Sequence, residues 1–179
     1  MGDQLSRLLA VRNGFFAFNS ALLVRPMTDT SDEYTLDQWN HAELWVSAYA
    51  ELAAGCYFFA EDLFGNQFAL SEMGVLSFEA ETGETEMVGA TIEEWAMNLI
   101  EECDLMTGLP LADAWQEKNG ILPCRSRLVP KVPFVVGGGF ELENLYLSES
   151  VAAMKFRASL ALQMRDLPDG SLIRLVISD

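Results

Sequence analysis

The sequence is poor in positive charge and in histidine. Its 179 residues include 11 Lys and Arg against 27 Asp and Glu, with one His, and the formal net charge at pH 7 is −16. A nucleic-acid-binding role is disfavoured, because contacts to phosphates are made chiefly by Lys and Arg. The same charge disfavours binding to membranes with anionic headgroups. Basic proteins are the partners that this composition attracts.

Cysteine and long apolar runs are also scarce. Cys56, Cys103 and Cys124 are odd in number and form no CxxC pair, so the sequence predicts neither a disulfide framework nor a zinc site. The acidic positions fit no EF-hand spacing. No apolar run approaches the roughly 18 to 20 residues that span a bilayer, and no secretory signal pattern is present. We therefore expect a cytoplasmic protein without a metal or cofactor.

The negative charge is concentrated in the middle of the chain. Residues 26–117 contain 20 carboxylates and no Lys or Arg. Complementary charge speeds protein association and penalises wrong partners. We therefore expect an acidic surface that binds a cationic protein, such as a nuclease with a basic phosphate-binding surface. The candidate acids are a pair in a loop and four residues of a helix, namely Glu61, Asp62, Glu93, Glu94, Glu101 and Glu102.

Aromatic residues are candidate anchors for such a partner. Interface energy is concentrated in a few aromatic and Arg side chains. The exposed members of one aromatic set are therefore predicted to contact the partner, and the set is Tyr34, Trp39, Trp115 and Tyr146. Trp at helical positions also belongs commonly to a core, so the structural alternative stays open for these residues.

Hydrophobic spacing predicts one domain over residues 1–179 that mixes helices with short strands. Strands are expected at 15–24, 56–60, 67–70, 74–78, 86–88, 132–136 and 172–177. Helices are expected at 5–12, 35–52, 91–103 and 111–118 and from 148 onward. The elements do not alternate strictly as β-α-β. We predict an α+β fold with a mostly antiparallel twisted sheet of about five to six strands and helices packed against one face.

Catalysis has little support in the residues. The only histidine, His41, lies in an expected helix, where a structural role is common, and none of the cysteines lies in a nucleophile motif. Glu61 or Asp62 could serve as a general acid or base, but adjacent residues of an extended chain point to opposite sides. The glycines at 137–139 lack the spacing and the Lys-Ser/Thr of a phosphate-binding loop. We expect a protein that is not an enzyme, with a carboxylate-dependent enzyme as an alternative.

A longer motif extends through the first half of the chain. The segment FFAEDLFGNQFAL at 58–70 follows Trp39-Asn40 and Glu43-Leu44-Trp45 and precedes IEEW at 92–95. This pattern resembles the SUKH superfamily of the Smi/Knr type, from Leu36 to the C-terminus, and the 58–70 hairpin is its specific part. The resemblance implies an α+β fold. It implies packing and turn roles for Phe59, Phe64, Gly65 and Phe68, and a loop-ordering role for Asp62.

The resemblance also implies a function in protein binding. In the superfamily that this chain resembles, many bacterial members are immunity proteins. These bind and neutralise a polymorphic toxin, often a nuclease or deaminase. Fungal relatives resemble regulators of cell-wall synthesis, so a regulatory scaffold or peptide-binding protein is the alternative. No catalytic residue is carried over. The sequence leaves the cognate toxin and the oligomeric state open.

Overall fold

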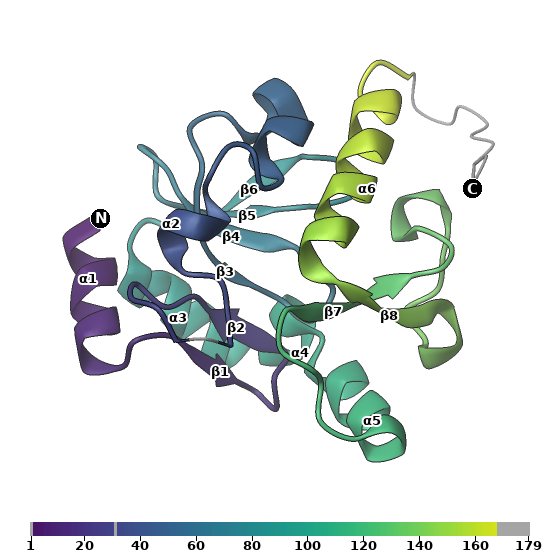
Figure 1. Cartoon of the computed structure of the whole chain (residues 1–179), viewed down its shortest axis with the longest axis horizontal. Helices are drawn as coiled ribbons and strands as arrows, with labels where there is room; N and C mark the ends of the chain where they lie inside the picture. Colours follow the sequence, from purple (N-terminus) through teal and green to yellow (C-terminus); the bar gives the residue numbers. More distant parts are fainter. Residues whose placement is uncertain (1, 31, 168–179) are drawn as a thin grey trace.

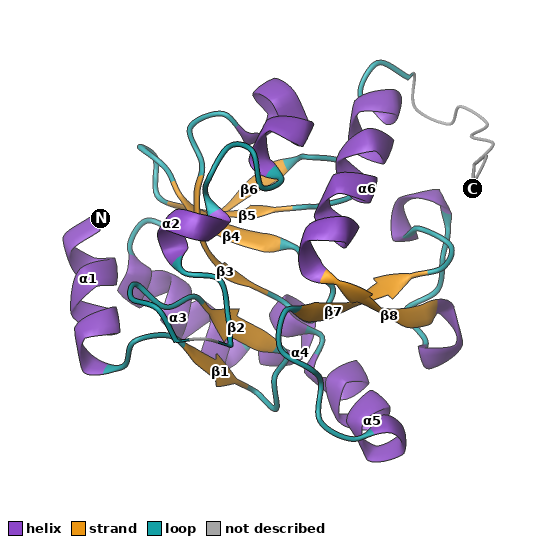
Figure 2. Cartoon of the chain, in the orientation of Figure 1, coloured by secondary structure: helices purple, strands orange, loops and turns teal. Residues whose placement is uncertain are grey.

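A computed structural model describes residues 2–30 and 32–167. Within them, a six-stranded antiparallel sheet has the order β1-β2-β3-β4-β5-β6, and β7 and β8 form a second sheet (Figures 1 and 2). The strands are β1 (Phe15–Ala17), β2 (Leu22–Val24), β3 (Tyr57–Glu61), β4 (Gln67–Leu70), β5 (Val75–Phe78), β6 (Thr85–Gly89), β7 (Ser126–Pro130) and β8 (Leu145–Glu149). The predicted α+β class and the antiparallel sheet are confirmed.

The helices are distributed along the whole described chain. They are α1 (Gly2–Val11), α2 (Leu36–Trp39), α3 (Ile92–Glu101), α4 (Cys103–Thr107), α5 (Leu109–Asn119) and α6 (Ser150–Met164), with 3-10 helices η1 (Val46–Ala53), η2 (Phe134–Val136) and η3 (Leu142–Asn144). The start of α3 is capped as its sequence predicts, because the Thr91 hydroxyl accepts the Glu94 N–H at 3.1 Å. In the described residues, no helix has the length and apolar character needed to cross a membrane.

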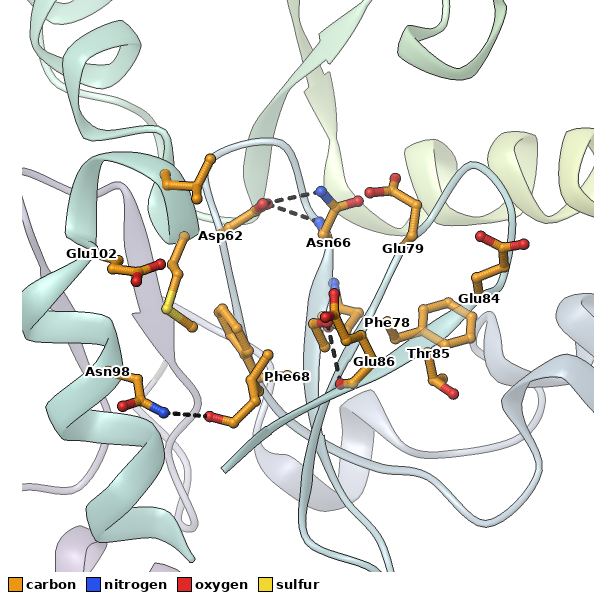
Figure 3. A pocket seen from close by; sticks show the side chains of 15 residues that line it. Asp62, Asn66, Phe68, Phe78, Glu79, Glu84, Thr85, Glu86, Asn98 and Glu102 are labelled. Atoms are coloured by element: carbon orange, nitrogen blue, oxygen red, sulfur yellow. Dashed lines mark hydrogen bonds between the residues drawn. The ribbon is translucent and has the colours of Figure 1, made fainter. Parts of the chain in front are cut away.

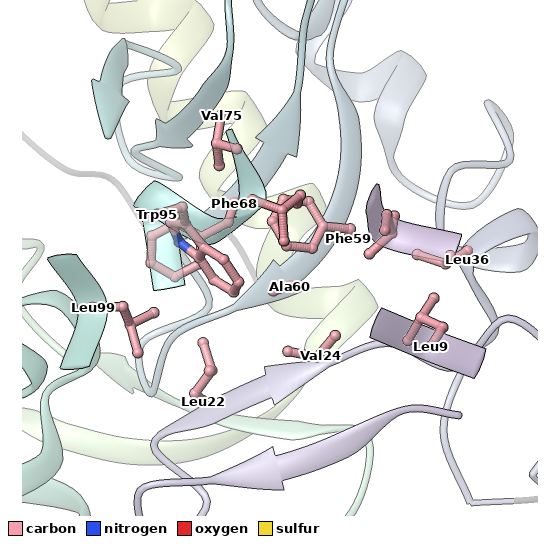
Figure 4. Packing of buried hydrophobic residues seen from close by; sticks show 12 residues of the cluster. Leu9, Leu22, Val24, Leu36, Phe59, Ala60, Phe68, Val75, Trp95 and Leu99 are labelled. Atoms are coloured by element: carbon pink, nitrogen blue, oxygen red, sulfur yellow. The ribbon is translucent and has the colours of Figure 1, made fainter. Parts of the chain in front are cut away.

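Helices cover both faces of the large sheet, which corrects the expectation of one covered face. Phe58 and Phe59 are neighbours on β3 and therefore point to opposite faces. Phe59 packs with residues of α1 and α3, including Trp95 (Figure 4). Phe58 packs with Trp45 and with apolar residues of η1 and α6. Each face has a buried apolar cluster, so helices pack against both faces of the sheet.

The helix expected over 35–52 is interrupted. The side chain of Asn40 pairs with the backbone of β3, because its Nδ2 donates to Phe58 O at 2.7 Å and its Oδ1 accepts the Phe58 N–H at 2.8 Å. This pairing draws the chain toward the sheet after the four residues of α2. The chain resumes as the 3-10 helix η1, within which Ala50 has a φ of 50°. Apolar spacing indicated the buried face but not this side-chain bond.

Two strand predictions also differ from the structure. The expected strand at 15–24 is a hairpin, since Phe18, Asn19 and Ser20 have positive φ and the Ala21 N–H donates to Phe18 O at 2.9 Å. The expected strand at 132–136 contains η2, whose last residue precedes Gly137 with a φ of 94°. The strand predicted at 172–177 lies outside the described residues.

Candidate functional site

An open groove of about 850 Å³ lies on the α3 side of the large sheet (Figure 3). Its floor includes Phe68, Ser77 and Glu86, which are paired across β4, β5 and β6. Phe68 also contacts Trp95 of α3, with 5.4 Å between ring centroids, and this places the row on the α3 face. The end of α3 and the following α4 supply the opposite wall. The groove is therefore the part of this face that the helices leave uncovered.

The lining of the groove is acidic. Its carboxylates are Asp62, Glu79, Glu84, Glu86 and Glu102, and no Lys or Arg lines it in the described part of the chain. Of the predicted binding acids, the structure brings Asp62 and Glu102 into this groove. Glu93, Glu94 and Glu101 are exposed on α3 but outside the lining. Sequence reasoning missed Glu79, Glu84 and Glu86, whose only signal was their place around a polar turn.

Asp62 organises the loop between β3 and β4. Its Oδ1 accepts the N–H groups of Phe64 and Asn66, each at 2.8 Å, and its Oδ2 accepts Asn66 Nδ2 at 3.1 Å. Asn66 Oδ1 in turn accepts the Ala80 N–H at 3.0 Å, so the loop is joined to the chain after β5. Asp62 is 7% exposed and is one of the residues that line the groove.

The surroundings of Asp62 favour its protonated form. Burial, and then the nearby Glu79 carboxylate, raise the pKa of Asp62 from an ordinary 3.8 to about 7, against the opposing effects of Asn66 and Arg157. Burial also raises the pKa of Glu79. Because the pKa of Asp62 is higher in the folded than in the unfolded chain, this group lowers the free energy of unfolding as pH rises between its two pKa values.

We expect a pH titration of the Asp62 carboxyl ¹³C shift to have its midpoint near 7. The Glu79→Gln variant removes the facing charge, so the midpoint for Asp62 should fall. Glu93→Gln removes a charge from the exposed side of α3 and serves as the control, with no change in the midpoint. A wild-type midpoint close to the ordinary value of 3.8 would contradict this account.

Glu61 belongs to a buried ion cluster that we name the Arg25 cluster, made of Arg25, Glu33, Glu61 and Arg127. Glu61 Oε2 lies 2.7 Å from Arg25 Nη2, and Glu61 Oε1 lies 2.9 Å from Arg127 Nε. Glu33 Oε2 lies 3.7 Å from Arg25 Nη1. Burial alone would raise the pKa of Glu61, but the two guanidinium groups hold this pKa below its ordinary value. The cluster joins the segment after β2 to β3 and β7.

The prediction that Glu61 and Trp39 belong to a docking surface is therefore wrong, because both side chains are buried. Glu61 is 1% exposed and Trp39 is 0% exposed. The guanidinium carbon of Arg25 lies 3.4 Å from the centroid of the Trp39 ring, and Trp39 Nε1 donates to Gln67 Oε1 at 2.9 Å. Both side chains face the interior because their polar groups are satisfied there.

The other predicted aromatic anchors come from separate elements, and none lines the groove. Tyr34 is half-buried beneath the Arg125 guanidinium, whose carbon lies 4.6 Å from the ring centroid. Trp115 of α5 is half-buried against the apolar cluster beside the small sheet. Tyr146 of β8 is 41% exposed and remains accessible.

The hairpin motif residues occupy the interior. Phe59 and Phe68 both contact Trp95 in the cluster on the α3 face (Figure 4). Phe64 packs on Phe134 with 5.3 Å between centroids. Gly65 has a φ of 82°, and a Cβ there would lie 2.7 Å from Arg157 Nη2. Glycine is required at this turn by backbone conformation and by the approach of a buried arginine.

The chemistry of the remaining polar groups is limited. In the described residues, no group of three His, Cys, Asp or Glu side chains could hold a metal ion. His41 is exposed and lies outside the groove lining. The glycines at 137–139 form part of a loop in which Asn144 Nδ2 donates to the Gly139 carbonyl oxygen at 3.0 Å.

Comparison with known proteins supports the fold class. The crystal structure of Atu4351 from Agrobacterium tumefaciens superimposes with a TM-score of 0.58 over 87% of this chain and 74% of that chain, at 13% sequence identity. At this identity the likeness shows the fold alone. No family model matches the sequence, and no curated protein is significantly similar to it.

Proposed function

We propose that this protein is a non-catalytic binding module of the immunity type, which captures a cationic toxin domain through its acidic groove. The observation that supports the proposal is the groove itself, which has five carboxylates in its lining and no Lys or Arg. A partner with a basic nucleic-acid-binding surface, such as a nuclease or deaminase, would be occluded by this contact. The resemblance of the 58–70 hairpin to the SUKH superfamily supports the immunity role.

The rest of the acidic segment supports capture at longer range. Of the 20 carboxylates within residues 26–117, 15 belong to exposed residues. Summed surface charge steers an oppositely charged protein during diffusion. At physiological salt the Debye length is about 8 Å, so only carboxylates close to the docked partner retain a strong effect. The groove carboxylates are the ones that would stay effective in the complex.

We expect capture to depend steeply on salt. A purified basic nuclease or deaminase toxin domain that is the cognate partner should bind the full chain with an affinity that falls at least about tenfold between 50 and 300 mM NaCl, because opposite charges are screened. Isothermal titration calorimetry measures the affinity, and growth rescue on co-expression measures neutralisation. An uncharged osmolyte at matched osmolality is the control. Salt-independent binding, or binding without rescue, would contradict the proposal.

A further inference from the structure

The strand β6 is the last strand of the large sheet, and one of its edges is open. Within residues 2–30 and 32–167, β6 pairs with β5 and with no other strand (Figure 2). Residues 84–87 are all exposed to solvent. The open stretch ends at Val88, the extra residue of a bulge, whose carbonyl oxygen accepts Asn98 Nδ2 of α3 at 3.1 Å. We name the open segment 84–87 the β6 edge.

The register of β5 and β6 determines which backbone groups point outward at this edge. In an antiparallel pair, residues that exchange hydrogen bonds alternate with residues whose backbone groups point away from the partner strand. The Glu79 N–H donates to Glu84 O at 2.9 Å, so Glu84 and Glu86 bond toward β5. The N–H and C=O groups of Thr85 and Met87 therefore point away from β5. In the described part of the chain, no hydrogen bond outside the sheet ladder uses these outward groups.

The side chains of the β6 edge indicate which kind of strand could pair with it. Glu84 and Glu86 are two residues apart and line the acidic groove, with Glu102 on its helix side (Figure 3). Met87 is 59% exposed and faces the other side of the sheet, because it is adjacent to Glu86. A second copy of this chain would set the glutamates of two edges near one another, which destabilises strand pairing. The complementary strand has positive side chains on one face and apolar side chains on the other.

We propose that an extended basic segment of the protein partner joins β6 as an added antiparallel strand, with alternate Lys or Arg side chains in the acidic groove. This inference rests on the proposed function and specifies how the partner is held. Neighbouring strands of the large sheet are all antiparallel, and this pairing is the more stable per residue. Main-chain hydrogen bonds at a sheet edge supply affinity, and alternate side chains supply specificity.

Antiparallel pairing fixes which residues of the added segment face the β6 edge. Residues directly opposite one another carry their side chains on the same face, so a basic residue lies opposite Glu86 and an apolar residue opposite Met87. The backbone groups of Met87 point to the added strand, whereas those of Glu86 point to β5. The N–H groups that bond to β6 therefore belong to the apolar residues of the segment. The N–H groups of its basic residues face away.

Fluorescence polarisation with the full chain tests this arrangement. The probe is a fluorescein-labelled peptide, Gly-Arg-Val-Arg-Val-Arg-Val-Gly, at 50 mM NaCl. N-methylation of its valines removes the N–H groups that face β6 and should weaken binding at least about tenfold. N-methylation of its arginines is the matched control, because it adds the same number of methyl groups at the same charge. This control peptide should lose less than about threefold in affinity, since its valine N–H groups are intact.

A proline in the β6 edge tests the same contact from the side of the protein. Met87→Pro removes an N–H that faces the added strand and spares the bonds to β5, and proline is tolerated at strand edges. It should weaken peptide binding about tenfold. Glu86→Gln should weaken binding more than Glu93→Gln, which lies outside the groove lining and should have an effect below about twofold. The methylated peptides act on the wild-type chain, so they decide the question if Met87→Pro misfolds.

Several results would overturn the added strand. They are equal losses from the two methylated peptides, a larger loss from methylation of the arginines than of the valines, and no binding of the unmethylated peptide. Sedimentation velocity supplies another, because a dimer of this chain that Met87→Pro dissociates would identify a second copy as the occupant of the edge.

The toxin-domain experiment distinguishes failure of the added strand from failure of the proposed function. If a cationic toxin domain is bound in a salt-dependent manner and folded Met87→Pro leaves its affinity unchanged, capture stands and the added strand is wrong. If the peptides behave as expected but no toxin domain is bound or neutralised, the immunity role is wrong.

Discussion

The Glu61→Gln variant is expected to lose about 3–5 kcal/mol of the free energy of unfolding, because it leaves two buried guanidinium groups without their shared carboxylate. Arg25 is 0% exposed and Arg127 is 1% exposed, so water cannot replace the missing partner. Glu33 stays near Arg25 at 3.7 Å but does not form an ion pair with Arg127. The charge of Glu61 is therefore needed both by Arg127 of β7 and by Arg25, which follows β2.

Urea unfolding at pH 7 measures this loss. The pKa of Glu61 is held below its ordinary value, so its stabilising contribution is complete above that value and is lost as pH falls through the folded-state pKa. The difference between wild type and variant should shrink over the same acidic range. Glu84→Gln, at an exposed position, is the matched control and should change stability by less than about 0.5 kcal/mol. A loss at Glu61 as small as the control would refute the structural role of the Arg25 cluster.

Trp95→Ala is expected to destabilise the fold by about 3–5 kcal/mol, since a large aromatic side chain leaves a cavity in the core. Trp95 is 3% exposed, and its ring meets Phe59 at 4.9 Å and 79° and Phe68 at 5.4 Å. These contacts join α3 to β3 and β4. The substitution therefore removes the largest side chain by which α3 packs on the sheet.

Trp95→Phe is the matched variant for this prediction. The buried Trp95 Nε1 has no hydrogen-bond partner in the described residues, so removing the indole N–H breaks no bond. Loss of stability in Trp95→Phe should therefore be clearly smaller than in Trp95→Ala when both are measured by thermal and urea unfolding. Equal losses in the two variants would show that ring packing is not the main contribution.

Local sequence patterns predicted the helices and strands that are determined by residues close together in the sequence. Thr91 and Glu94 marked the start of α3, and the two short strands expected at 56–60 and 67–70 marked the hairpin around 58–70. The sequence also indicated that adjacent Glu61 and Asp62 point to opposite sides, and in the structure one joins the Arg25 cluster while the other lines the groove. The six-stranded sheet follows from such short signals because its neighbouring strands are consecutive in the chain.

The site was harder to predict because the residues that form it are far apart in the sequence. Glu61 is removed from the surface by Arg25 of the region after β2 and by Arg127 of β7, and no local pattern connects these residues. Glu79 lies near Asp62 only because β4 and β5 fold the chain back. The count of acidic residues indicated charge, but the pairing of strands decided which carboxylates share a groove.

The depth of the Arg25 cluster separates the response of the fold to salt from the response of the groove. Dissolved ions screen exposed charges strongly and buried pairs much less. Glu61 and Arg25 are enclosed, whereas Glu84 and Glu86 are exposed to solvent. Concentrated salt should therefore elute the proposed cationic partner from this protein while both sheets remain joined, so the recovered chain should bind again after desalting.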